Sequence, residues 1–361
     1  MNSLHVFPSI CVALLAQLHA SALELPQNIP SSSVPEKQVH HVDTLNIHDP
    51  AILADPVSRR YYVYDSLHVG HPMEKLESPT GAAGVEGYWS EDLVHWHGPE
   101  LVYAIEADSW ANSDHAPWAP EVSYYQGKYY LFLTFHDYDT IIDSKPGRPT
   151  MYKRGSQILV SDSPLGPFQR MHNQAHTPAD EMALDGTLYV EDGQPWMIYC
   201  HEWVQIGDGL IKAIRLSDDL SETIGEAITL INAADVEWTA KVSDYGGVTS
   251  RAVVTDGPWP YVSKTGKLML LWSSWNIDTQ QRYTTSLAFS DNGKLTGNWS
   301  HREEPLIAGD RGHGNLFRTF DGELMMALHR YFNQPHTRLQ IWRIEDLGHD
   351  LRIIEQAYGH R

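Results

Sequence analysis

One pattern, made of a strand, a tight turn and a second strand, occurs five times along the 361 residues of the chain. The first strand of each copy is apolar, the turn contains Gly, Asp or Pro, and the second strand is aromatic or aliphatic. Such runs are typical of β-hairpins. The copies start roughly every 55 to 75 residues, which is the scale of one blade of a β-propeller. They span residues 50–64, 120–132, 185–199, 256–272 and 314–328.

Further short β-rich runs lie between the hairpins, for example Gln157–Ser161 and Thr285–Phe289. Two hairpins, or a hairpin with two such runs, make a four-stranded blade. No segment sustains the 3.6-residue period of a long helix. A β-sandwich is the alternative architecture, but it does not account for five units of one pattern. We therefore expect an all-β chain folded as a five-bladed β-propeller.

The composition restricts the class of partner. The formal net charge is −20, so the chain lacks the clustered Lys and Arg of a surface that binds nucleic acid or an anionic membrane. Aromatic residues make up 11% of the sequence, with 12 Trp and 18 Tyr. Aromatic side chains pack β-sheets and also stack on flat sugar faces. A neutral carbohydrate is compatible with both features.

The N-terminus predicts secretion. An apolar run over Ile10–Leu18 is too short to span a bilayer, and Ala20-Ser21-Ala22 follows it as a cleavage site. We expect a signal peptide over residues 1–22, a Pro- and Ser-rich tail over 23–40 and one catalytic propeller over 41–361. Cleavage would leave Cys200 as the sole cysteine, so an extracellular chain would have no internal disulfide.

Acidic residues recur at one position of the repeat, where the first strand of each copy begins. In a propeller these ends converge on the central axis. Each acidic side chain alone could simply cap a turn. A ring of them is costly, because like charges in one pocket raise each other's pKa, and it therefore indicates a functional site. The residues at this position are Asp49, Glu121, Asp185, Asp256 and His313.

Paired carboxyl groups across one pocket are what glycoside hydrolysis requires. One group protonates the leaving oxygen, and the other activates water or attacks the sugar. Several tryptophans near strand ends could stack on the sugar, although most tryptophans in a β-fold serve the core. The residues that we expect to bind substrate are Trp118, Glu121, His201, Trp203, Trp259 and His313.

The chain resembles glycoside hydrolase family 43, the family of arabinanases, arabinofuranosidases and xylosidases. The resemblance runs from about Asp43 to the fifth repeat. Each motif is short, but all of them occur in the order of the family. The motifs are His48–Ile52, Ser90–Trp96, Trp118–Glu121, Val160–Phe168, Leu184–Gly186, Thr255–Pro258 and Gly312–Gly314.

The resemblance implies a five-bladed propeller and an inverting mechanism. Asp49 matches the family's general base, and Asp185 matches the aspartate that adjusts the pKa of the acid. The family's general acid is a Glu in a Glu-Gly-Pro motif, where this chain has Asp256. An Asp is one methylene shorter, so Glu202 in His201-Glu202-Trp203 is an equally good candidate for the acid. Glu237 is a weaker third candidate.

His313 matches a histidine that many family members place at the axis beside a calcium or sodium ion. A single His is a poor calcium ligand, so a structural role at the axis is the alternative. The sequence shows no zinc motif. We expect that the reaction requires no cofactor.

These features predict a secreted hydrolase that removes sugars from plant-wall polysaccharides, with α-L-arabinofuranosidase as the first choice. β-Xylosidase, endo-arabinanase and β-galactofuranosidase remain open alternatives. A non-catalytic carbohydrate-binding propeller is the alternative from another class, and Asp256 in place of Glu favours it. Asp49 and Asp185 argue against it, because a lectin needs neither a base nor a residue that adjusts a pKa.

Overall fold

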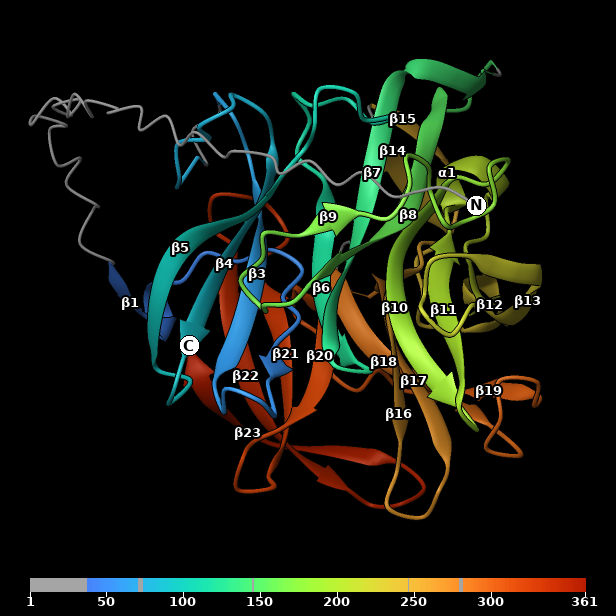
Figure 1. Cartoon of the computed structure of the whole chain (residues 1–361). Coiled ribbons are helices and arrows are strands. Elements are labelled where there is room, and N and C mark those ends of the chain that lie inside the picture. The colour runs from blue at the N-terminus through green and yellow to red at the C-terminus, as the bar shows by residue number, and fades with distance from the viewer. Residues whose placement is uncertain (1–37, 71–73, 145, 246, 279–281) are drawn as a thin grey trace, which may run out of the picture. The chain divides into compact units, whose positions relative to one another are not determined.

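Five antiparallel sheets are arranged as a five-bladed β-propeller, as predicted, in the computed structural model of the chain (Figure 1). The structure describes residues 38–70, 74–144, 146–245, 247–278 and 282–361. The expected signal peptide, residues 1–22, lies outside the described residues. No helix in these ranges is long and apolar enough to cross a membrane.

The first blade has five strands in the order β1-β5-β4-β3-β2, and the second has four in the order β6-β7-β8-β9. The strand β1 begins two residues before the boundary expected at residue 41, and it pairs with the outer strand β5. In the first blade the strands are β1 (Val39–His41), β2 (Leu53–Ala54), β3 (Tyr61–Leu67), β4 (Gly84–Ser90) and β5 (His95–Ala104), with a 3-10 turn η1 (Val42–Thr44) after β1. In the second they are β6 (Trp118–Tyr125), β7 (Lys128–Asp143), β8 (Met151–Ser161) and β9 (Gln169–Arg170).

The third, fourth and fifth blades each have four strands in chain order. The third contains β10 (Ala183–Glu191), β11 (Gln194–His201), β12 (Leu210–Leu216) and β13 (Thr223–Asn232), with the short helix α1 (Trp203–Ile206) after β11 and the 3-10 turn η2 (Ala233–Asp235) after β13. The fourth contains β16 (Asp256–Val262), β17 (Leu268–Trp275), β18 (Tyr283–Ser290) and β19 (Trp299–His301). The fifth contains β20 (Arg311–Arg318), β21 (Leu324–Arg330), β22 (Arg338–Asp346) and β23 (Leu351–Gly359).

Two hairpins extend beyond the regular blades. The strands β7 and β8 are the longest of their blade, and they rise at the top of the view in Figure 1. A separate hairpin, β14 (Val242–Tyr245) with β15 (Val248–Arg251), lies between the third and fourth blades in the sequence.

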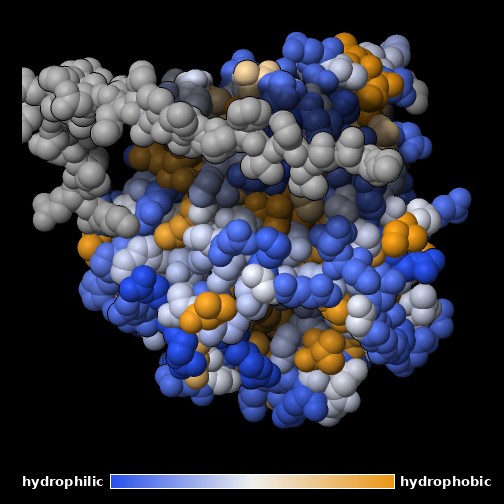
Figure 2. Space-filling model, viewed as in Figure 1, coloured by the Kyte–Doolittle hydropathy of each residue, from blue (hydrophilic) through white to orange (hydrophobic). Residues whose placement is uncertain are grey.

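The second strand of each blade is apolar on both faces, because each sheet packs against a neighbour on either side. Side chains alternate between the faces of a strand. In β17, Leu270 packs in a cluster with the third blade, and Leu271 packs in a cluster with the fifth. In β7, Leu131 faces the first blade and Phe132 faces the third. The viewed surface is mostly hydrophilic, with hydrophobic residues scattered over it (Figure 2).

The propeller closes through packing and side-chain hydrogen bonds. The fifth blade consists only of strands from the C-terminal part of the chain, so the first and last blades share no strand. Val63 and Tyr61 pack in one cluster with Met325 and Ile341. The buried amide of Asn315 accepts a hydrogen bond from the Ile52 N–H (3.0 Å) and donates one to the Ile52 carbonyl (2.9 Å). These bonds link the innermost part of the fifth blade to that of the first.

Replacing Asn315 by Leu should therefore destabilise the whole propeller. The similar-sized side chain would leave both the N–H and the carbonyl of Ile52 buried without a partner, at a cost of about 2–4 kcal/mol in the free energy of unfolding. Denaturant unfolding of wild type and Asn315→Leu measures this difference. The control is Asn298→Ala, since exposed Asn298 bonds only to Asp291 in its own loop. Equal losses in the two variants would contradict the closing role of Asn315.

Candidate active site

The inner strands enter the axis through a repeated backbone irregularity. One residue at each entry has a left-handed φ between 43° and 57°. In four of the blades it lies within a β-bulge of the innermost pair of strands. A bulge re-aims side chains, and here it turns them toward the axis. The five left-handed residues are Asp49, Ala119, Asp185, Gly257 and His313.

The positions of these left-handed residues correct part of the equivalence between blades that the sequence predicted. Asp49, Asp185 and His313 occupy equivalent positions. The equivalent residue in the second blade is Ala119, two residues before Glu121, and in the fourth blade it is Gly257, one residue after Asp256. Bulges could not be placed from the sequence, because the extra residue that they insert leaves the strand pattern on either side unchanged.

A cavity of about 410 Å³ opens at this end of the axis. All five blades and the β14–β15 hairpin contribute to its wall. The carboxyl groups of Asp49, Asp185, Asp256 and Glu202 line it, together with those of Asp65 and Asp244. The structure thus brings together the four residues that the sequence suggested for catalysis.

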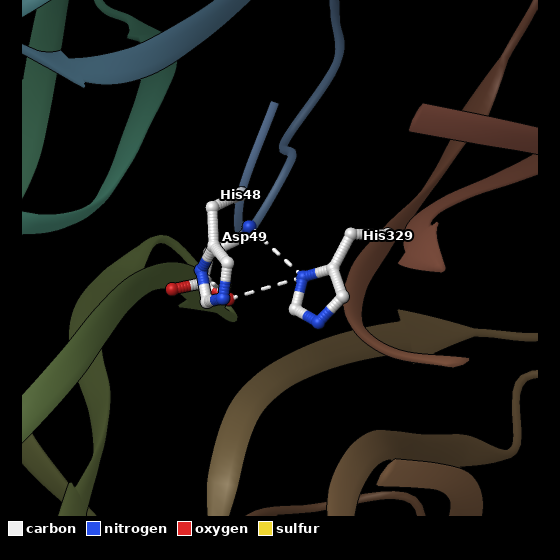
Figure 3. A group of neighbouring side chains, drawn as sticks. All are labelled: His48, Asp49 and His329. Atoms are coloured by element: carbon white, nitrogen blue, oxygen red, sulfur yellow. Dashed lines mark hydrogen bonds and ion pairs between the residues drawn. The ribbon is translucent and has the colours of Figure 1, made fainter. Parts of the chain in front are cut away.

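Asp49 is surrounded by histidines. Its Oδ1 atom lies 2.9 Å from Nδ1 of His48 and 3.3 Å from Nδ1 of both His313 and His329. Its backbone N–H donates to His329 Nδ1 at 3.1 Å. Figure 3 shows His48 and His329 flanking Asp49. Burial alone would raise the pKa of Asp49, but His313 and His48 outweigh that effect and hold it well below its ordinary value. Asp49 is therefore ionised at neutral pH.

The three residues of Figure 3 could in principle hold a metal ion, since His48, Asp49 and His329 each offer a ligand atom within 4.8 Å of the others. Their hydrogen bonds favour a different role. The Nδ1 lone pair of His329 already accepts the Asp49 N–H, and His48 bonds through Nε2 to the Phe332 carbonyl at 3.0 Å. Burial lowers the pKa of His48, but Asp49 reverses that shift and raises it. A protonated His48 donates to Asp49 rather than to a metal.

The side chain of Asp185 bridges the third and fourth blades. Its Oδ2 atom accepts a hydrogen bond from the Gly257 N–H at 3.0 Å, and its own N–H donates to Thr134 Oγ1 at 2.9 Å. The Oδ2 atom also lies 3.8 Å from His313 Nδ1. Burial, opposed by His313 and supported by the charge of Asp49, raises the pKa of Asp185 to about 6.

The surroundings of Asp256 favour its protonated form. Burial and the neighbouring charge of Asp185 raise its pKa well above the ordinary value. Its Oδ2 atom accepts a hydrogen bond from the Tyr283 hydroxyl at 2.9 Å. No basic side chain is paired with it among the described residues. Asp256 is thus suited to donate a proton.

Glu202 differs because it is paired with a buried cation. It follows β11 and forms an ion pair with Arg154, whose side chain is fully buried. Burial raises the pKa of Glu202, and the charge of Arg154 opposes that rise. The pair places a carboxylate, rather than a neutral acid, beside the cavity.

The predicted substrate-binding residues fall into two groups. Trp118, Trp203 and His313 line the cavity. Glu121 and Trp259 instead line a narrow channel on the axis. Asp49, Asp185 and His313 line both this channel and the cavity. His201 points away from the cavity and contacts Gln205 and Glu181. It is therefore not part of the cavity wall, because successive residues of an extended chain face opposite sides, and Glu202 takes the side that faces the cavity. Exposed Glu237, the third candidate for the acid, does not line the cavity.

Sequence reasoning missed several residues of the cavity wall. Asp244 and Tyr245 reach it from the β14–β15 hairpin, and Phe332 and Gln334 reach it from the loop after β21. The Asp-Tyr-Gly-Gly turn over residues 244–247, between two β-rich runs, was a usable hairpin signal. The sequence around Phe332 has no pattern that predicts its position at the cavity.

Solved structures share this fold. The endo-arabinase from Bacteroides thetaiotaomicron VPI-5482 is 35% identical and superposes with a TM-score of 0.70, over 84% of this chain and 96% of that one. The α-L-arabinofuranosidase from Lactobacillus brevis is 17% identical, with a TM-score of 0.60 over 83% of this chain and 92% of that one. The xylan β-1,4-xylosidase from Bacillus halodurans C-125 is 18% identical, with a TM-score of 0.59 over 87% of this chain and 56% of that one.

A family profile decides the assignment. The profile of Glycosyl hydrolases family 43 matches residues 42–346. The chain belongs to glycoside hydrolase family 43. The resemblance noted in the sequence is thereby confirmed, and this family 43 protein is an enzyme that cleaves glycosidic bonds. The alternative of a non-catalytic binding propeller is not retained.

The channel of this family 43 hydrolase contains a carboxyl group with an unusual pKa. Burial raises the pKa of Glu121 to about 8, although its hydrogen bond from Thr187 (2.7 Å) opposes the rise. The folded chain therefore binds a proton more tightly than the unfolded chain, whose Glu has a pKa near 4.5. Between these two values the folded state holds more protons, so stability falls as the pH rises.

Replacing Glu121 by Gln should remove this part of the pH dependence. The free energy of unfolding of Glu121→Gln, relative to wild type, should rise by up to about 4 kcal/mol between pH 5 and pH 9. Denaturant unfolding at several pH values measures it, with the exposed Glu226→Gln as a control. A difference between variant and wild type that stays constant with pH would show that Glu121 is ionised throughout.

Proposed function

We propose that this family 43 enzyme is an α-L-arabinofuranosidase that removes arabinofuranosyl residues from plant-wall polysaccharides with inversion. The observation that carries the proposal is the cavity at the end of the axis, which an ionised Asp49 and a protonated Asp256 both line. Inverting glycosidases need this combination of one base and one acid. A wall built by all five blades favours a pocket for the end of a chain over an open groove.

The residues support a single displacement. Asp49 takes a proton from a water molecule, and the water oxygen bonds to the anomeric carbon. The bond from that carbon to the leaving oxygen breaks on the opposite face, and Asp256 gives its proton to the leaving oxygen. His48 and His313 keep Asp49 ionised, and His329 orients its backbone by accepting the Asp49 N–H. Asp185 keeps Asp256 protonated through its charge and fixes the adjacent backbone through Gly257.

We assign the acid to Asp256 rather than to Glu202. The charge environment separates them, since Asp185 opposes ionisation of Asp256, whereas Arg154 favours ionisation of Glu202. The hydrogen bond from Tyr283 orients the shorter Asp side chain, which compensates for the methylene that a Glu would add.

The reaction as proposed requires no cofactor. Calcium prefers oxygen ligands. The Nδ1 atom of His313 faces the carboxylates of Asp49 and Asp185, and Glu121, the other carboxyl group of the channel, has a pKa of about 8. These residues do not fit a calcium site, and no step depends on an ion. We also propose that residues 1–22 direct secretion, which suits a polymeric substrate outside the cell.

Substitution of the base and the acid should separate their roles. Asp49→Asn should lower kcat by about 10²–10⁴-fold on every substrate, because nothing else activates the water. Asp256→Asn should lower kcat similarly on nitrophenyl glycosides, but much less on dinitrophenyl glycosides, whose leaving group needs little protonation. The control is Asp162→Asn at the exposed partner of Lys128, which should match wild type. Sparing of the dinitrophenyl substrate in Glu202→Gln, and not in Asp256→Asn, would transfer the role of acid to Glu202.

A substrate panel tests the choice of sugar. Wild type should cleave nitrophenyl α-L-arabinofuranoside at least about tenfold faster than the xyloside and galactofuranoside, and EDTA should leave this rate unchanged. From arabinan or arabinoxylan it should release free arabinose, as expected for exo action. Endo-arabinase activity is the second candidate, because the Bacteroides relative at 35% identity has that name. Oligosaccharide products from linear arabinan, with no free arabinose at early times, would favour it.

A further inference from the structure

We propose that Arg154 is a positioning residue that holds Glu202 as a carboxylate acceptor for one hydroxyl group of the bound sugar. The inference deepens the proposed function and rests on its assignment of the acid to Asp256. It gives Glu202 a role in substrate specificity and gives Arg154, which does not line the cavity, a role through its neighbours.

Arg154 lies at the centre of a network that joins four elements of the chain. From β8 its Nη1 atom pairs with Glu202 after β11, and its Nη2 atom donates to the Tyr245 hydroxyl of β14 at 2.9 Å. Its Nε atom donates to Nδ1 of His136 in β7 at 2.9 Å. The guanidinium group also lies 4.3 Å from the ring centre of Trp118 in β6. Each part of the planar guanidinium group thus has a partner.

Three of these partners line the cavity, namely Glu202, Tyr245 and Trp118. Arg154 itself has 0% of its side chain exposed, and Glu202 has 3%. A buried ion pair is a weak source of stability, because desolvation offsets the attraction of the charges. The position of the pair behind the cavity wall therefore indicates a role in shaping the cavity rather than in stabilising the fold.

His136 supports the direction of the hydrogen bonds. Burial and the charge of Arg154 hold the pKa of His136 well below its ordinary value, so the ring is neutral. A neutral imidazole can accept the Nε–H bond through Nδ1. All the fixed groups around Arg154 are then acceptors, and Glu202 is the one that carries negative charge.

Glu202 retains acceptor capacity after it binds Arg154. A carboxylate has two oxygens with about four acceptor sites, of which Arg154 occupies one through Oε2. The remaining sites can accept a hydroxyl hydrogen from a sugar in the cavity. Trp118 lies on the same wall and offers an aromatic face for stacking against the ring. Together these groups form a site for a neutral furanose with a hydroxyl directed at Glu202.

Three variants test the network on the aryl glycoside that wild type cleaves fastest. Glu202→Gln keeps the shape but loses the charge, so KM should rise about 10- to 100-fold, the value of a hydrogen bond to a charged group. The ratio between good and poor leaving groups should not change. Arg154→Lys keeps a charge but cannot hold three partners, so KM should rise in the same direction. Tyr245→Phe should give a smaller rise, since it removes one partner of Arg154.

Monodeoxy analogues of the same glycoside locate the contact. Wild type should lose about 10- to 100-fold in kcat/KM on one analogue and less on the others. Glu202→Gln should lose nothing further on that analogue, because the hydroxyl and the carboxylate act as one contact. The double variant Arg154→Lys with Glu202→Gln should be no worse than the poorer single variant, since both remove the same interaction.

The matched control is Arg302→Lys, which weakens a partly buried pair with Asp350 away from the cavity. It should leave KM unchanged whatever it does to thermal stability. The inference would be overturned if Glu202→Gln lowered kcat/KM by the same factor on every deoxy analogue as on the parent glycoside. A wild-type KM in Arg154→Lys would also overturn it. Selective sparing of good leaving groups in Glu202→Gln would overturn the acid assignment as well. An error in the proposed arabinofuranoside specificity would be detected separately, by the substrate panel with wild type.

Discussion

Burial of both faces of every sheet is the constraint on which the rest of the structure depends. Each blade can cover its apolar faces only by packing against a blade on either side, and five such blades close into a ring. Alternating residues such as Leu270 and Leu271 serve neighbouring blades in turn. The innermost strands are then forced toward one axis, so residues far apart in the chain meet there.

The converging strands bring several buried carboxyl groups close together, and the site uses the resulting repulsion to set their protonation states. Carboxyl groups buried near one another cannot all be ionised. His48 and His313 stabilise the charge of Asp49, whereas the charge of Asp185 opposes ionisation of Asp256. Equal side chains at neighbouring positions thus acquire opposite protonation states, which is what acid–base hydrolysis requires. Glu202 is in a third environment, because it forms an ion pair with the buried side chain of Arg154.

The fold and the family were predictable because they depend on repeated local patterns. Strand, turn and alternation are visible within a few residues, and five copies leave little choice of architecture. The positions of Asp49, Asp185 and Asp256 near the axis followed from the same repeat. The register at the axis did not, because a bulge moves Ala119 and Gly257 into the positions expected for Glu121 and Asp256. His201 was misplaced for the related reason that neighbouring residues of a strand face opposite ways.

The sequence by itself therefore determined the number of blades, the family and the residues available for catalysis. The tertiary structure alone decided which carboxyl group has which protonation state, because a pKa depends on burial and on charges that are close in space. His329 and Asp49 are 280 positions apart in the chain, and Arg154 and Tyr245 are 91 apart. Local sequence patterns carry no information about such contacts, and only the closed ring brings them together.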